Sequence, residues 1–212
     1  MIRYFAEHWE LFGTAFAEHL YLVFVTLFFS LLLAALISGL ILRQKWLSNG
    51  VVQIFSAVYS IPSLALFAIL IPIFGLGNQT AVIVLVIYNQ YLLIRNILAG
   101  IWNIDATILE AGIGMGMNRW QLARTIQIPL AMPSILAGIR LAIISTTGIA
   151  TIAATINAGG LGTVLFSGLR TMNVYKIVWG TILSMVIALG ADVSLKKLEE
   201  LWKRKGEAGR KL

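Results

Sequence analysis

The sequence contains no cysteine and few charged residues, which make up 12% of its 212 residues. The lack of cysteine excludes disulfide bonds and cysteine-based metal sites. Soluble domains carry about a quarter charged residues, so the low charge content argues against a soluble protein. Because 59% of the residues are hydrophobic, the composition instead predicts an integral membrane protein.

Several chemical motifs are also absent. The sequence has no Walker A motif (GxxxxGK followed by Ser or Thr), no nucleophile elbow and no cluster of His and Glu residues. We therefore expect that the chain is not an enzyme, that it holds no metal or other cofactor, and that ATP is bound by a separate subunit. The net charge of +7 does not indicate nucleic-acid binding, because the basic residues lie at the ends of apolar segments rather than on one face.

Long uncharged segments predict five membrane spans in a single transmembrane domain, residues 1–212. The first segment has 23 uncharged residues, which as a helix would measure about 34 Å and cross a hydrocarbon core of about 30 Å. Residues 46–94 form a second, with 49 residues, enough for two crossings and a turn at residues 74–80. Residues 4–19 are expected to form a separate short amphipathic helix. The expected spans are about 20–42, 51–74, 80–102, 134–157 and 175–195.

The distribution of Lys and Arg predicts the orientation. Eleven of these residues fall on one side of the predicted spans and three on the other. The positive-inside rule therefore places the N-terminus outside and the C-terminus in the cytoplasm, in the cytoplasmic membrane of a bacterium or archaeon. The basic tail, residues 196–212, is interpreted as a helix end at the membrane surface that anchors this topology, with partner binding as the alternative.

A polar segment, EAGIGMGMNRWQLARTIQIP at residues 110–129, lies within the predicted cytoplasmic loop 103–133. Residues 105–115 can form a short helix, after which Gly116 permits a backbone turn that a side chain would resist. Asn118 is a good N-cap, and the glutamine three residues later resembles the second half of a capping box. The pattern therefore predicts a helix–turn–helix elbow.

The second helix of this elbow would present Trp120, Leu122, Ile126 and Ile128. Pro129 is expected to end it, because proline disfavours the helical conformation of the preceding residue. Pro133 would then open the fourth span in a permitted first-turn position. Exposed apolar residues with arginines around them suit docking into a groove on a soluble partner.

The spacing of this loop resembles a motif in the permease subunits of ABC importers. That motif reads EAA, three residues, Gly, nine residues, Ile-x-Leu-Pro. Gly112 replaces the second alanine and Ile128 replaces the leucine, and neither change disturbs the spacing. The matching positions, predicted to form the ATPase-coupling loop, are Glu110, Ala111, Gly112, Gly116, Ile126, Ile128 and Pro129.

The resemblance implies an all-α integral membrane protein with the five-helix, type I ABC importer (MetI-like) permease fold. It also implies partners. In that family the loop is a coupling helix held in a cleft of a cytoplasmic ABC ATPase subunit. A second permease chain, identical or related, completes the pathway within the lipid bilayer, and an extracytoplasmic substrate-binding protein delivers the solute.

Two further stretches, residues 59–79 and 157–173, resemble the permeases that import quaternary-amine osmoprotectants such as glycine betaine, carnitine or choline. An ABC permease for amino acids or another small solute is the alternative within the class. An ion-coupled secondary transporter is the alternative from another class. It would be expected to carry internal repeats, which the sequence does not display.

Both stretches contain candidate gate or hinge residues. Pro62 interrupts the predicted second span, either as a tolerated kink or as a hinge that exposes irregular backbone to a cavity. The run AGGLG contains Gly159, Gly160 and Gly162. It is either a flexible turn or, as the resemblance implies, the start of a short re-entrant or surface helix near the external gate.

The sequence gives expected surroundings for two arginines within the spans and leaves two possible roles for three amides. Arg140 is expected to reach the cytoplasmic headgroups, since helical side chains lean toward the N-terminus. The helix that carries Arg95 is expected to start outside, so the same lean directs this side chain away from the cytoplasmic headgroups. Arg95 is therefore expected to face protein or a hydrated cavity. Three amides of the third span either join helices or line the passage: Asn89, Gln90 and Asn96.

Three tyrosines are available for an aromatic cage around a quaternary amine: Tyr59, Tyr88 and Tyr91. Packing or an interfacial belt is the alternative. The sequence assigns no substrate-binding residue.

Overall fold

The computed structural model describes residues 1–208, with side chains described as far as residue 202. Helices form the whole of this part apart from short connections, with no strand in it, so the predicted all-α fold class is confirmed. Four helices are long and apolar enough to cross a membrane, and a bent pair supplies the fifth candidate span. Residues 209–212, the end of the predicted basic tail, lie outside the described residues.

The first long helix differs from its prediction. After the short helix α1 (Ile2–Glu7), α2 runs without interruption from Trp9 to Ile41, so residues 4–19 are not a separate amphipathic helix. The chain breaks instead at His8, whose φ of −124° and ψ of 26° leave the helical region. No proline follows within α2, and the helix therefore extends to about 50 Å.

The second predicted span is not one straight helix. It consists of α3 (Lys45–Tyr59) and α4 (Ser63–Phe74), whose axes differ by 96°. The break includes Pro62, which has an extended ψ of 136° and precedes the first residue of α4. A proline has no N–H to offer a helix and constrains the residue before it. Pro62 therefore coincides with a complete break rather than a tolerated kink.

The predicted turn at residues 74–80 is present. Gly75 (φ 79°) and Gly77 (φ 107°) both have left-handed backbone angles, and α5 then runs from Asn78 to Trp102. Only glycine adopts such angles without steric cost, which explains why the chain reverses here.

The fourth predicted span begins earlier than expected. Helix α7 (Arg119–Leu122), the π-helical segment η1 (Ala123–Gln127), α8 (Ile128–Ala153) and the short η2 (Ala154–Ile156) form one run of 38 residues.

The prediction that Pro129 ends a helix is wrong. In η1 the N–H of Ile128 bonds to the carbonyl of Ala123, five residues back, and Pro129 then lies in the first turn of α8, where proline is accepted. Pro133 lies inside α8 rather than opening it.

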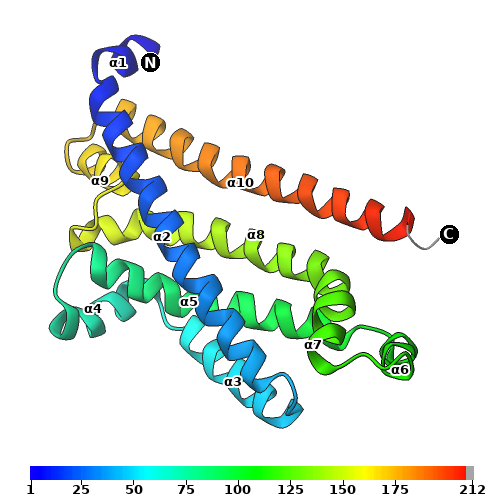
Figure 1. Cartoon of the computed structure of the whole chain (residues 1–212). Helices are drawn as coiled ribbons and strands as arrows, with labels where there is room; N and C mark the ends of the chain where they lie inside the picture. Colours follow the sequence, from blue (N-terminus) through cyan, green and yellow to red (C-terminus); the bar gives the residue numbers. More distant parts are fainter. Residues whose placement is uncertain (209–212) are drawn as a thin grey trace.

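The remaining helices are α9 (Leu161–Arg170) and α10 (Val174–Ala208). Helix α10 continues well past the predicted span, 175–195, so the basic tail is helical as expected through its described part. Figure 1 shows α5 and α8 side by side at the centre of the bundle, with α2 crossing them. Helices α1 and α9 lie at one end, and α6 (Ala106–Gly114) and α7 lie at the other.

Small residues allow α5 and α8 to approach closely. A Cβ at Gly138 would lie 2.7 Å from the Cβ of Asn96, and one at Gly100 would lie 2.8 Å from that of Ser134. Such contacts replace the hydrophobic effect as the source of helix association in a membrane. Asn89 of α5 adds a buried polar contact at the centre, because its Nδ2 donates to Ser30 Oγ (3.1 Å) and Thr146 Oγ1 (2.9 Å).

Candidate functional site

The predicted elbow exists and comprises α6, a turn, α7 and η1, residues 106–127. Asp105 begins it as the N-cap of α6, because its carboxylate accepts from the backbone N–H of Thr107 at 2.9 Å. A carboxylate at this position satisfies an N–H that has no partner within the helix. Glu110 and Ala111 then lie exposed on α6, and Gly112 is buried.

The turn after α6 is a Schellman motif. Met117 N–H donates to the Gly112 carbonyl (3.2 Å) and Gly116 N–H donates to the Ile113 carbonyl (2.9 Å). Gly116 has a φ of 78°, which is the left-handed conformation that this motif requires at its reversal point. The glycine in the predicted motif therefore sets the direction in which the chain leaves α6.

A capping box starts α7, as the sequence predicted. The Asn118 side chain accepts from the backbone N–H of Gln121 (2.9 Å), and the Gln121 side chain accepts from the backbone N–H of Asn118 (2.8 Å). Two N–H groups at the helix start are thereby satisfied reciprocally.

The two arms of the elbow interlock at Gly112. A Cβ at this position would lie 2.7 Å from Leu122 Cδ1 and 2.8 Å from Ile126 Cδ1, so both side chains pack where the glycine leaves space. These two side chains are therefore half-buried rather than presented to a partner, in contrast to the prediction. Ile128 is exposed, and Pro129 accepts a hydrogen bond at its carbonyl from Trp202 Nε1 of α10 (2.9 Å).

The exposed apolar tip of the elbow consists of three other residues: Ile113 (61% exposed), Met115 (69%) and Trp120 (71%). Only Trp120 was predicted. The other two directly precede the turn at Gly116, and their place at the end of α6 was the sequence signal that could have identified them. Exposed apolar side chains on a membrane protein's polar loop suit contact with another molecule.

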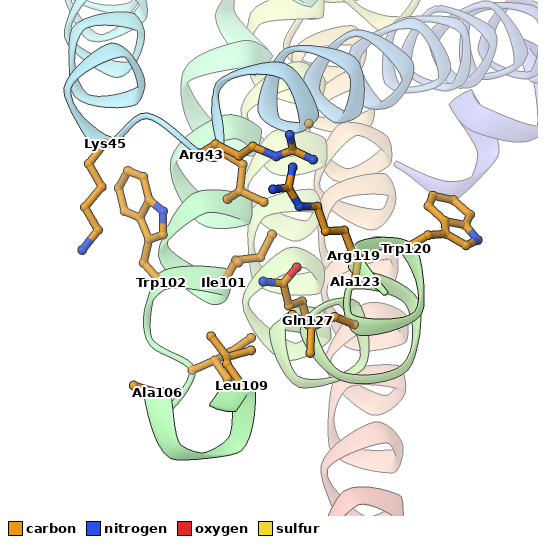
Figure 2. Close-up of a pocket in the computed structure, with 14 residues that line it drawn as sticks. Arg43, Lys45, Ile101, Trp102, Ala106, Leu109, Arg119, Trp120, Ala123 and Gln127 are labelled. Atoms are coloured by element: carbon orange, nitrogen blue, oxygen red, sulfur yellow. The ribbon is translucent and has the colours of Figure 1, made fainter. Parts of the chain in front are cut away.

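Beside the elbow lies a hollow of about 760 Å³ between the ends of α2 and α5 and the elbow itself. Figure 2 shows the side chains of Arg43 and Arg119 extending toward one another across it, with Lys45 and Trp102 at its side. From the sequence, Arg43 and Lys45 served only to orient the chain, and only the arginines of the elbow, which include Arg119, were expected to take part in docking. The structure brings them together at the elbow, where like charges favour an acidic partner surface.

The predicted hinge residues lie away from the elbow. Pro62 occupies the break between α3 and α4, and Gly159 and Gly160 form a turn with φ values of 75° and 74°. Ile61 in the break and Ala158 beside the turn belong to one hydrophobic cluster. The break and the turn therefore pack against the same core.

The glycine turn is not a free loop. Gly160 N–H donates to Glu18 Oε2 of α2 at 2.8 Å, and a Cβ at Gly159 would lie 2.7 Å from the same oxygen. At Gly162 a Cβ would overlap the Thr151 carbonyl oxygen, so α9 starts in direct contact with the backbone of α8. The expectation that the AGGLG run starts a short helix agrees with α9, which begins at Leu161. His19, buried beside Gly160, was not predicted.

Three predicted polar residues within the spans have defined partners. Arg140 forms ion pairs with Asp192 (3.1 Å) and Glu199 (3.6 Å) of α10, two partners that the expected contact with headgroups did not include. Its carboxylate partners lie more than fifty residues away in the sequence and could not be identified from it. Asn89 joins helices, as described above, and Gln90 Nε2 donates to the Ser30 carbonyl (3.4 Å).

Together these features are the architecture of a transporter subunit: an all-helical membrane bundle with a rigid, partly apolar elbow at one end. The chain belongs to the family of binding-protein-dependent transport system inner membrane components, which its residues 16–203 match. It is thus a membrane permease subunit.

Relatives and solved structures agree with this family. The chain is 36% identical over 200 residues to the carnitine transport permease protein OpuCD of Listeria monocytogenes, covering 94% of this chain and 90% of the relative. It is 34% identical over 194 residues to the glycine betaine/carnitine/choline transport system permease protein OpuCB of Bacillus subtilis (92% and 89%). Its fold matches an inward-facing structure of the MetNI methionine ABC transporter with a TM-score of 0.82 at 21% identity, covering 92% of this chain and 98% of that one.

Proposed function

We propose that this chain is the permease subunit of an ATP-driven importer for quaternary-amine osmoprotectants such as glycine betaine, carnitine or choline. The observation that carries the substrate class is the similarity to OpuCD and OpuCB over about nine-tenths of each chain. The MetNI structure supports only the fold, since its identity is below 25%. Import of an amino acid or another small solute is the alternative within the class.

The elbow is proposed to dock on a cytoplasmic ABC ATPase subunit. Its exposed apolar tip and the cations of the adjacent hollow supply the two kinds of contact that protein interfaces use, an apolar centre and charged surroundings. The elbow continues into α8 without a loop. A displacement of the elbow by the ATPase would therefore move the central helix of the bundle directly.

The remaining partners and the orientation follow from the same proposal. The elbow end, with its basic residues, would face the cytoplasm, and the N-terminus would lie outside. A second permease chain, identical or related, would complete the pathway. An extracytoplasmic binding protein would deliver substrate at the end that carries α1 and α9.

Uptake of radiolabelled substrates tests the proposal. The chain is produced together with a candidate ABC ATPase and a candidate binding protein from the same organism, in cells that lack their own osmoprotectant uptake. Uptake is measured at high osmolarity. We expect uptake of at least one quaternary amine that depends on ATP and on the binding protein. Uptake of labelled methionine or other amino acids instead would support the alternative, and nucleotide-independent, ion-driven uptake by the chain alone would refute the class.

A further inference from the structure

The structure brings three tyrosines together beside the break between α3 and α4. The ring centroid of Tyr59 lies 5.2 Å from that of Tyr91 and 5.6 Å from that of Tyr88. Tyr59 ends α3, and the other two lie on α5. Three helices meet here, because the Tyr59 hydroxyl also lies 3.4 Å from Ser145 Oγ of α8.

The three rings have different accessibility. Tyr88 is buried and its hydroxyl donates to the Ile61 carbonyl at 2.6 Å, which satisfies a backbone acceptor in the broken segment. This is a structural role, since an unsatisfied carbonyl within a membrane is costly. Tyr59 and Tyr91 are only half-buried, so part of each ring remains available to another molecule.

Arg95 adds a positive charge to this cluster. Its Nη1 donates to the Tyr91 hydroxyl at 2.7 Å, and its Cζ lies 5.7 Å from the centre of the same ring. The side chain thus points toward the start of α5 and away from Trp102, which ends the helix near the elbow. Arg95 is nevertheless exposed to the surroundings of the protein. The guanidinium is directed at an uncharged residue, and its other donors are available for an anionic group.

The depth of the cluster makes an exposed arginine informative. Tyr59 lies about 21 Å from the start of α3, and Tyr91 lies about 17 Å from the end of α5, at 1.5 Å per residue. Both positions are near the middle of a hydrocarbon core of about 30 Å. An arginine exposed to lipid at such a depth costs at least a few kcal/mol, so this face is expected to be hydrated or covered by a ligand or protein.

We propose that this cluster is a substrate-contact site in the permease itself. The rings of Tyr59 and Tyr91 contact the quaternary ammonium group by cation–π interaction, and Arg95 binds the carboxylate of a zwitterionic substrate, which replaces the Tyr91 hydroxyl as acceptor. A break between helices near the bilayer midplane also forms the substrate site in secondary transporters. The inference rests on the proposed function.

The chemistry separates two groups of substrates. Glycine betaine and carnitine carry both a quaternary ammonium and a carboxylate, whereas choline carries the ammonium alone. All three would need the tyrosine rings, but only the first two would need Arg95. The comparison of zwitterionic substrates with choline in one variant therefore measures the role of the arginine. The amount of folded protein is the same for all substrates and does not affect this comparison.

Transport by the complete complex in proteoliposomes tests this site. We expect Arg95→Gln to raise KM for glycine betaine and carnitine at least tenfold and to leave KM for choline within twofold, with Arg95→Lys partly restoring the zwitterions. Tyr59→Leu and Tyr91→Leu should each raise KM for all three substrates about tenfold or more, and Tyr59→Phe, which keeps the ring, should raise it less than threefold. The control is Tyr21→Leu, at an exposed position of α2, which should leave all three unchanged.

Two results would overturn the site while leaving the proposed function intact. One is an equal change for choline and glycine betaine in Arg95→Gln, and the other is normal KM values in both leucine variants. Assembly of each variant with the ATPase, measured by co-purification, separates folding failure from loss of substrate contact. If the leucine variants do not assemble, the ratio of the KM values for choline and glycine betaine in Arg95→Gln decides the case. Absence of wild-type uptake of all three substrates would instead refute the proposed function, and the site with it.

Discussion

Replacing Gly116 with valine would test whether the geometry of the elbow, rather than its composition, couples this permease to its ATPase. Gly116 has a φ of 78°, and a Cβ placed there would meet nothing within 4 Å. The penalty is therefore conformational and not steric. A left-handed backbone costs an ordinary residue roughly 1–2 kcal/mol, and a β-branched residue is still less suited to it.

The matched control is Gly114→Val, two residues earlier. That position also has open space around it but lies within helix α6, where valine is accepted slightly better than glycine. The two variants make the same chemical change on the same surface. They should differ by about 2 kcal/mol in the stability of the elbow, which corresponds to a factor of roughly 30 in the ratio of the folded to the unfolded elbow.

The assay is ATP-dependent uptake by the assembled complex, with membrane insertion measured in parallel. We expect Gly116→Val to insert normally and to lose most of its transport, because the turn no longer holds α6 against α7. Gly114→Val should transport at close to the wild-type rate. If both variants transport equally well, the left-handed turn is not required for coupling, and the mechanical role given to the elbow is wrong.

Three further substitutions test the packing of the bundle, with thermal unfolding in detergent as the measurement. Gly162→Ala should lower Tm clearly, because its Cβ overlaps a backbone carbonyl of α8, whereas Gly148→Ala, with open space around it, should not. Arg140→Gln should lower Tm and loosen α10, because its ion pairs with two carboxylates of α10 are lost. The control, Arg124→Gln at an exposed position, should have little effect on Tm. Equal Tm values for the two variants would contradict the importance of the ion pairs. Asn89→Leu should destabilise the protein by about 1–2 kcal/mol, since it leaves two buried hydroxyls without their partner, and an unchanged Tm would refute that role.

The elbow shows how much local sequence can predict. Its first helix, its reversal at Gly116 and the capping box of Asn118 and Gln121 all follow from residues within four or five positions of one another. Such contacts form wherever the segment is placed, because they depend on backbone geometry and short side chains. The apolar segments likewise indicated the membrane helices, since their length and lack of charge are properties of the chain itself.

Tertiary structure decided the features that depend on distant partners. The proline at position 62 predicted an interruption, but the 96° bend depends on where α4 packs after the break. The continuity of the elbow with α8 depends on a π-helical turn, which the two prolines did not indicate. The sequence predicted that Arg140 reaches the headgroups, and only the fold shows that it forms an ion pair with Asp192 of α10.

The contrast is clearest at the tyrosine cluster. The sequence by itself determined that aromatic rings, an arginine and several membrane helices are present in this chain. It did not determine that Tyr59 and Tyr91, separated by the whole of α4, lie 5.2 Å apart beside an exposed Arg95. That arrangement requires α3, α5 and α8 to meet, and the meeting is set by helix packing over the entire bundle rather than by any local preference of the residues involved.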